Sequence, residues 1–294
     1  MLEVVNIRVR SFDLDYLDLF WEVAPTHEDV ADYTFVVEKS LSEFGPFYDL
    51  TDPFANRFQL RDNTVRGQHS FYLNTYYRIR VNHVPSGTQT VFPKEGNGVC
   101  LSVKPDLVAL EMARINRLKL KEFSGRKVWV FPKKKFGQRC SCYDVVTQRK
   151  TRSSCPTCFD TGWAGGYDAP MEIYAQVFTP QESTIKTDFA EVENENTMGV
   201  FPNYPELFEG WVVVEAENIR WRVGSTLNKI KKSRALVRQE VPLHRIPKGD
   251  IEYALPINIS DVSVLKANPD RNMTNPQNLE AADVIDTALN LFRK

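Results

Sequence analysis

Apolar residues recur at every second position through much of the first ninety residues. Residues 5–9, 16–23, 33–40 and 76–81 alternate in this way, and stretches containing Gly, Pro, Asn and Asp separate them. Alternation with a period of two is typical of strands that bury one face, and short strands at this spacing indicate a β-sandwich. The pattern therefore predicts a sandwich at the N-terminus with Trp21 in its core.

Three features of this region resemble a fibronectin type III domain. Trp21 lies in an early strand, a strand containing Phe35 precedes Gly45-Pro46-Phe47, and residues 76–81 form an aromatic strand. The resemblance covers residues 1–95 and implies a sandwich of two sheets with no catalytic residues.

A helical pattern follows the predicted sandwich. Pro105 and Asp106 suit the first turn of a helix, and apolar residues then recur at helical spacing until Ser124-Gly125. The residues of this apolar stripe are Leu107, Val108, Leu110, Met112, Ile115 and Leu118. Residues 127–131 read as one further strand. We therefore assign residues 96–170 to a helix and a cysteine-rich connector.

Period-two patterns return after residue 170. Residues 171–178, 210–214, 219–224, 236–242 and 250–257 are candidate strands, and the polar, acidic residues 181–196 are predicted to form a loop. We expect residues 171–257 to form a small β-barrel or sandwich. Residues 258–294 are predicted to be a linker followed by an amphipathic helix over 278–292. The fold class predicted overall is mainly β and multi-domain.

Composition limits the classes of protein that need to be considered. The chain has 294 residues, 42% of them apolar, and a formal net charge of −1, which is typical of a globular protein with two or three domains. No apolar run approaches the length of a membrane span, so no membrane partner is expected.

Four of the five cysteines lie within nineteen residues. Cys140 and Cys142 form a C-x-C pair, and Cys155 and Cys158 form a C-x2-C pair twelve residues later. Two short turns that each supply two thiolates are typical of a tetrahedral zinc site. Four thiolates leave no open coordination position, so the predicted Zn²⁺ is structural.

Two other arrangements of these cysteines remain open. They could form two disulfides, but the first fifteen residues lack the basic and apolar regions of a signal peptide, so an oxidising compartment is not expected. They could also hold an iron–sulfur cluster, which uses the same ligands.

The middle of the chain is strongly basic. Thirteen Lys or Arg residues and two acidic residues lie between Arg114 and Arg152. Seven of the basic residues flank the cysteines: Lys133, Lys134, Lys135, Arg139, Arg149, Lys150 and Arg152. Such a patch can make non-specific contacts with DNA phosphates or with a partner protein, or form a solvated surface.

The segment from Cys155 to Pro170, with residues 220–224 and 249–256, resembles head-to-tail connector and neck proteins of tailed bacteriophages. The resemblance implies a ring-forming structural subunit of the virion, assembled in the host cytoplasm. Its expected partners are copies of itself and the portal, adaptor, tail or sheath proteins.

Several functions other than a neck protein remain open. A baseplate or collar protein is a neighbouring alternative, and a zinc-ribbon protein that binds nucleic acid is a different class. The sequence shows no nucleophile–base pair, phosphate loop or acid–base pair, so an enzyme is not expected.

Overall fold

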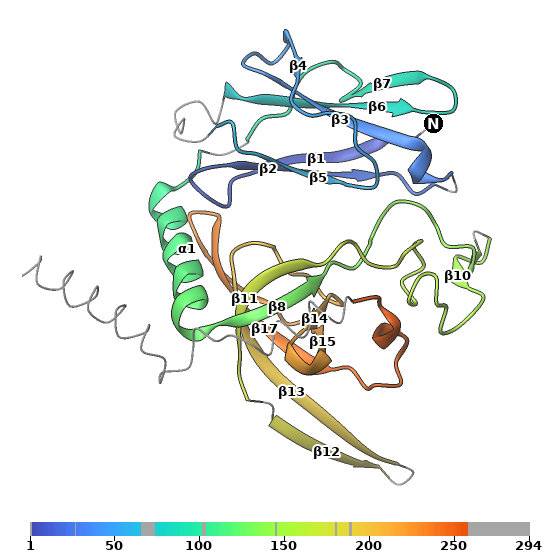
Figure 1. Ribbon diagram of the computed structural model, residues 1–294, viewed down its shortest axis with the longest axis vertical. Helices are drawn as coiled ribbons and strands as arrows, with labels where there is room; N and C mark the ends of the chain where they lie inside the picture. Colours follow the sequence, from blue (N-terminus) through green and yellow to red (C-terminus); the bar gives the residue numbers. More distant parts are fainter. Residues whose placement is uncertain are drawn as a thin grey trace, which may run out of the picture.

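The computed structural model describes residues 2–26, 28–65, 74–101, 104–144, 146–179, 181–187 and 190–257. These residues are mainly β and include a six-stranded barrel and several sheets. A two-sheet N-terminal unit lies at one end, the barrel lies below it, and α1 lies at one side (Figure 1). The predicted linker and helix of residues 258–294 lie outside the described residues.

The N-terminal unit contains seven strands in two sheets. They are β1 (Val4–Arg10), β2 (Leu17–Val23), β3 (Tyr33–Ser40), β4 (Tyr48–Asp49), β5 (Gln59–Asp62), β6 (Tyr76–His83) and β7 (Thr88–Phe92). One sheet has the order β1-β2-β5 and the other β4-β3-β6-β7, with all neighbours antiparallel. A 3₁₀ helix, Val30–Asp32, precedes β3.

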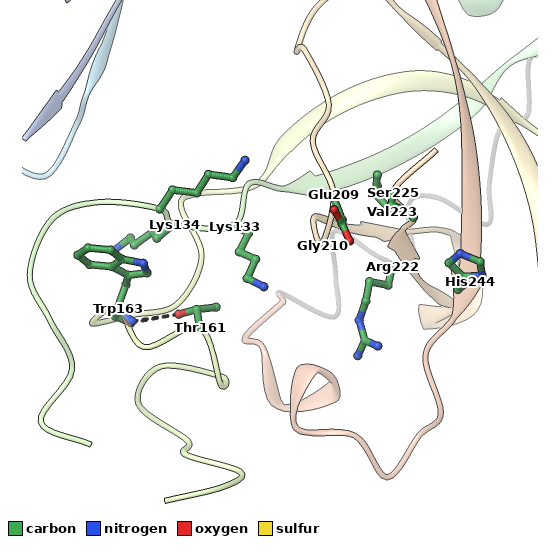
Figure 2. A pocket seen from close by; sticks show the side chains of 12 residues that line it. Lys133, Lys134, Thr161, Trp163, Glu209, Gly210, Arg222, Val223, Ser225 and His244 are labelled. Atoms are coloured by element: carbon green, nitrogen blue, oxygen red, sulfur yellow. Dashed lines mark hydrogen bonds between the residues drawn. The ribbon is translucent and has the colours of Figure 1, made fainter. Parts of the chain in front are cut away.

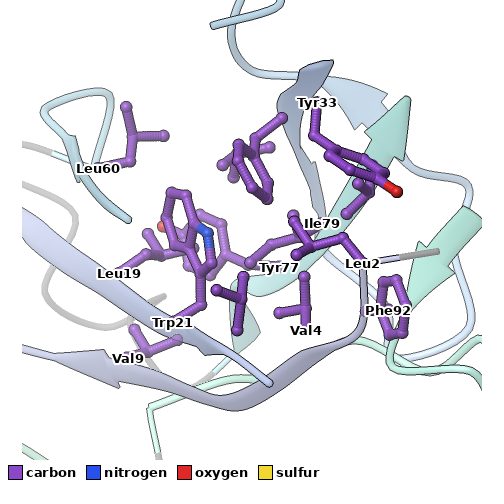
Figure 3. Close-up of a cluster of buried hydrophobic side chains, with 14 of the residues drawn as sticks. Leu2, Val4, Val9, Leu19, Trp21, Tyr33, Leu60, Tyr77, Ile79 and Phe92 are labelled. Atoms are coloured by element: carbon purple, nitrogen blue, oxygen red, sulfur yellow. The ribbon is translucent and has the colours of Figure 1, made fainter. Parts of the chain in front are cut away.

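The two sheets share one apolar core. Trp21 and Leu19 of β2 meet Phe35 of β3 and Tyr77 and Ile79 of β6 (Figure 3). These five side chains are almost completely buried, and they occupy alternate positions of their strands. The period-two pattern therefore corresponds to the inner faces of a sandwich, as expected.

A buried carboxylate lies at the edge of this core. Asp62 accepts hydrogen bonds from Tyr77 Oη at 2.6 Å, Lys39 Nζ at 2.9 Å and the Thr64 backbone N–H at 2.8 Å. Burial opposes ionisation of Asp62, but these hydrogen bonds outweigh it and lower the pKa below its usual value.

We expect Asp62→Asn to weaken the sandwich by about 1–3 kcal/mol at pH 7, because it removes an ionised acceptor from buried donors. A lowered pKa in the folded state adds stability above the unfolded pKa of about 3.9, and that stability is lost as pH falls through the folded pKa. The variant should therefore lose less stability than wild type between pH 5 and pH 3 in urea titrations. Asp49→Asn, at an exposed carboxylate, is the control. Equal acid sensitivity in Asp62→Asn and wild type would contradict this role.

The barrel closes on itself. Its strands are β8 (Arg126–Phe131), β11 (Met171–Val177), β13 (Ala190–Pro202), β14 (Val212–Val214), β15 (Arg220–Val223) and β17 (Ala235–Arg245). The order β13-β11-β8-β14-β15-β17 is completed by pairing between β17 and β13. Short 3₁₀ helices, Ala216–Asn218 and Ile251–Ala254, follow β14 and β17.

Alternate residues of the barrel strands fill its interior. Val128, Phe201, Val213, Trp221 and Val241 belong to one buried cluster. β8 supplies Val128, although the sequence division placed residues 126–131 in the connector. The cysteine-rich residues are thus an insertion between two paired barrel strands, β8 and β11.

The predicted acidic loop over residues 181–196 is wrong. β12 (Gln181–Thr187) and β13 pair from Gln181 with Asn196 to Thr187 with Ala190. The C-terminal part of β13 pairs with β17 from Asn196 to Pro202. The same strand extends beyond the barrel as the hairpin with β12, and residues 181–196 therefore form strands although their sequence has no apolar alternation. A similar extension, β16 (Asn228–Lys232), pairs with β17 on the other side.

Helix α1 (Leu107–Lys119) begins where the sequence predicts. Asp106 caps it by accepting hydrogen bonds from the backbone N–H groups of Val108 and Ala109. A π-helical turn, Leu120–Ser124, ends it. The helix packs on β17 and β13, but its buried residues are Ala109, Leu110 and Ala113. Most of the predicted apolar stripe is instead exposed, because the helix turns a different side, with two alanines and Leu110, toward the barrel.

Polar and aromatic contacts join the sandwich to the barrel. Asn203 Nδ2 donates to the Phe12 carbonyl at 2.7 Å, and the rings of Phe12 and Tyr204 lie 5.3 Å apart. Arg10 pairs with Glu206 across the same boundary. The two units therefore share a packed interface.

Candidate metal centre and adjoining basic pocket

The insertion begins as a continuation of the β8–β11 pair. The Asp168 N–H donates to the Pro132 carbonyl at 2.9 Å, and the Lys134 N–H donates to Gly166 at 3.0 Å. The Cys140 N–H then donates to Gly162 at 3.1 Å. These bonds bring the two ends of the insertion together, so both cysteine pairs face one centre. A short hairpin of β9 (Tyr143–Asp144) and β10 (Arg149–Lys150) lies between the pairs.

The insertion also contacts the sandwich. The Arg139 N–H donates to the Thr26 carbonyl at 3.0 Å, and the Thr26 N–H donates to Gly137 at 3.3 Å. The ring of Phe136 packs against Phe58 of the sandwich, with centroids 5.1 Å apart. The insertion is therefore fixed to both larger units.

The four predicted ligands come together and are buried. The sulfur atoms of Cys140, Cys142, Cys155 and Cys158 all lie within 4.8 Å of one another. Cys140 Sγ is 3.9 Å from Cys155 Sγ, and Cys142 Sγ is 3.5 Å from Cys158 Sγ. A disulfide would need about 2.05 Å, so the four thiols are free. The site can hold a metal ion.

The local backbone favours the thiolate form of Cys155. Hydrogen bonds from the backbone N–H groups of Cys158 and Thr157 lower the pKa of Cys155 to about 6, whereas burial raises the pKa of Cys142 and of Cys158. Asp160 accepts from the Cys155 N–H at 3.2 Å and holds the turn. A Cβ at Gly166 would lie 2.5 Å from the Cys158 carbonyl oxygen, so this position requires glycine.

Two aromatic residues of the insertion, Trp163 and Tyr167, make different contacts. The Arg139 guanidinium lies 3.7 Å above the Trp163 ring. Tyr167 packs with Phe131 and Val212 at the end of the barrel, and its hydroxyl donates to Glu252 at 3.0 Å. The buried cluster around the site consists of the four cysteines alone. Tyr167 thus connects the insertion to the barrel instead of covering the sulfur atoms.

Three of the seven basic residues line one pocket. Lys133, Lys134 and Lys135 line a pocket of about 670 Å³. Lys133 and Lys134 lie on its insertion side, opposite Arg222 and His244 of the barrel (Figure 2). Barrel residues Arg222 and His244 also line it. Glu209 is the acidic residue of the lining, and Glu252 and Asp250 pair with Arg222 from outside it. The lining therefore carries excess positive charge.

The excess positive charge acts on the Lys135 side chain. Its Nζ lies 4.4 Å from the centre of the Phe208 ring, and Lys229 Nζ lies 4.2 Å from the same ring. Burial, and then repulsion from Lys229 and Lys133, lowers the pKa of Lys135. A bound anion would relieve this repulsion.

The other four basic residues do not belong to that lining, although Arg139 contacts Trp163, which does. Arg139 stacks on Trp163 and Tyr143, and Lys150 donates to the Asp160 carbonyl at 2.8 Å. Arg149 and Arg152 are exposed in the insertion. The seven residues thus divide into a pocket group and an insertion group.

Sequence reasoning missed Arg222, His244 and Lys229 as members of the basic region. The alternation in β15 contained a signal for the first, because buried Trp221 and Val223 leave Arg222 on the outer face. The other two join the lysines only through the closure of the barrel, which no local pattern reveals.

No family model matches the chain, and no curated protein matches its sequence. Within the described residues, no helix has the length and apolar character needed to cross a membrane.

Proposed function

We propose that the chain is a non-enzymatic structural subunit of a tailed-phage virion, a ring-forming neck or head-to-tail connector protein. The observation that carries the proposal is the insertion, which is tied by backbone hydrogen bonds to the sandwich at Thr26 and to the barrel at Pro132. Because the insertion is attached to both larger units, the surfaces of all three are held in fixed positions, as a ring subunit requires. Baseplate or collar positions need the same property.

The strand order of the N-terminal unit supports the fibronectin type III assignment of this proposal. Sheets of three and four antiparallel strands face each other, with Trp21 between them. Fold alone does not assign function, so this likeness supports only the role of a structural domain.

Zinc is the metal that we propose for the four cysteines. A tetrahedral ion with Zn–S bonds of about 2.3 Å has sulfur atoms about 3.8 Å apart. The distances of 3.5 and 3.9 Å fit one such ion. A cluster would place several iron atoms between the thiolates and separate them further. All four ligands are protein thiolates, which suits a structural role and leaves no position for a reacting water.

The pocket of Lys133 to Lys135 favours a second candidate, a zinc-ribbon protein whose main function is to bind nucleic acid. Its excess positive charge suits the phosphates of a nucleic-acid backbone. Contacts with phosphates position the protein on the nucleic acid but do not recognise a base sequence. In the connector proposal the same pocket makes only non-specific contact with DNA or with a neighbouring virion protein.

Native mass spectrometry of the zinc-loaded chain, together with DNA titration at several salt concentrations, separates the two candidates. A connector should form a closed oligomer, and a dedicated nucleic-acid binder should bind DNA as a monomer with low-micromolar Kd at physiological salt. Lys133→Ala/Lys135→Ala should reduce any DNA binding about ten-fold or more and lower its salt dependence. Lys94→Ala, at an exposed position of the sandwich, is the control. A monomer that binds DNA this tightly would overturn the connector proposal.

A further inference from the structure

Helix α1 presents an apolar face with no partner among the described residues. Val108, Met112 and Ile115 follow one another at spacings of four and three, so their side chains lie on one side of the helix. Their exposed fractions are 59%, 44% and 54%. Leu107, Leu118 and, in the following turn, Phe123 are also exposed, Phe123 at 71%. So many exposed apolar residues on one short helix indicate a contact surface.

The chain itself supplies a segment with matching chemistry. Thirty-seven residues follow Ile257, and the last of them show a second helical pattern. Ala281, Ile285, Ala288 and Phe292 recur at spacings of four, three and four, which places them on one side of a helix. The acidic residues Glu280, Asp283 and Asp286 fall outside that apolar side.

Charge favours the same pairing. The segment 278–292 contains three acidic residues and no basic one. From Asp106 to Ser124, four basic residues stand against three acidic ones, and Lys232 acts on Asp106 at the start of the helix. Glu111 and Glu122 pair with Arg114 and Lys121, so Lys119 at the C-terminal end contributes the excess positive charge. Opposite charges around an apolar contact help to select the partner and its orientation.

The linker is long enough for docking within one chain. Residues 258–277 can span up to about 66 Å when extended, at about 3.3 Å per residue. The linker begins after Ile257, which packs with Val212 and Val214 of β14. The docking site, α1, packs on β17, so both points lie on the same barrel. The eleven-residue β17 is only about 37 Å long. A tether of this length gives the segment a high effective concentration at its own α1.

We infer that residues 278–292 dock as a helix on the apolar face of α1 in the same chain, with Val108, Met112 and Ile115 at the centre of the contact. The inference concerns one chain and is independent of the proposed virion role. It assigns an intramolecular partner to the exposed stripe of α1.

Photo-cross-linking in the full-length, zinc-loaded chain tests the inference. A benzophenone amino acid at position 112 should cross-link to peptides from 278–292, and the same probe at exposed Leu41 of the sandwich should not. Ile285→Asp should reduce the cross-link at least ten-fold, whereas Thr287→Asp, on the polar side, should change it less than two-fold. A mixture of unlabelled and ¹⁵N-labelled chains distinguishes links within a chain from links between chains.

Three results would overturn the inference. They are cross-links from position 112 that miss 278–292, light–heavy cross-links in the proportion that random pairing of chains gives, and equal losses in Ile285→Asp and Thr287→Asp. The expected link within one chain can form in a monomer and in a ring subunit alike, so failure of this inference is distinguishable from failure of the proposed function.

Discussion

Cys158→Ser is expected to abolish zinc binding and to unfold the insertion while the sandwich and the barrel stay folded. Cys158 is completely buried, and the four thiols form the only buried cluster that the structure describes within the insertion. Structural zinc contributes an apparent 10–16 kcal/mol, about as much as the whole stability of a domain. The cores of the sandwich and the barrel contain none of these cysteines.

Metal analysis and limited proteolysis measure this effect. Wild type should carry about one zinc per chain and resist proteolysis, and Cys158→Ser and Cys140→Ser should be cleaved between β9 and Asp160. Cys100→Ser, outside the cluster, should behave like wild type. Much less than one zinc in folded, fully reduced wild type would refute the metal assignment, and a protease-resistant insertion in Cys158→Ser would refute its structural role.

Arg61→Ala should be the most damaging substitution at the boundary between sandwich and barrel. The Arg61 guanidinium makes two hydrogen bonds to the Asp18 carboxylate, at 2.9 and 3.2 Å. It also stacks 3.6 Å above the Tyr16 ring and 4.7 Å from the Tyr204 ring. Asp18 is only 3% exposed, and burial raises its pKa even with Arg61 present. Removing the cation leaves a buried, unpaired carboxylate.

The expected loss is about 3 kcal/mol, the lower end of the range for broken buried pairs, because the Arg61 side chain is 34% exposed. Urea titrations of wild type, both single variants and Arg61→Ala/Asp18→Asn give the coupling energy. The double variant should recover part of the loss, since the amide needs no counter-charge. Arg8→Ala, in an exposed pair with Glu22, should cost less than about 1 kcal/mol. A similarly small cost for Arg61→Ala would show that the pair does not hold the boundary.

The sequence predicts those features that follow from a local pattern of residues. Alternation around Trp21 and Phe35 predicted the inner faces of the sandwich, because a strand that buries one face must repeat every two residues. The spacing of Cys140, Cys142, Cys155 and Cys158 predicted that they meet, because tight turns place neighbouring thiols on one side.

Other features depended on contacts between distant parts of the chain. β8 reads as an isolated strand, and only its pairing with β11 and β14 makes it part of the barrel. The sequence predicts the apolar stripe on α1 but not which side the helix buries, because the side with Ala109 and Ala113 carries little apolar signal and yet packs on the barrel. Lys133 and Arg222 lie 89 positions apart, and the fold alone brings them to one pocket.

The attachment at Thr26 has a mechanical consequence. The sandwich and the barrel are connected covalently through residues 93–106, and a second time through the hydrogen bonds that join Thr26 to Gly137 and Arg139. Tension that pulls the two units apart is therefore shared between the covalent connection, the contacts of Phe12 with Asn203 and Tyr204, and the insertion. The share that passes through the insertion depends on the four sulfur atoms that close its loop.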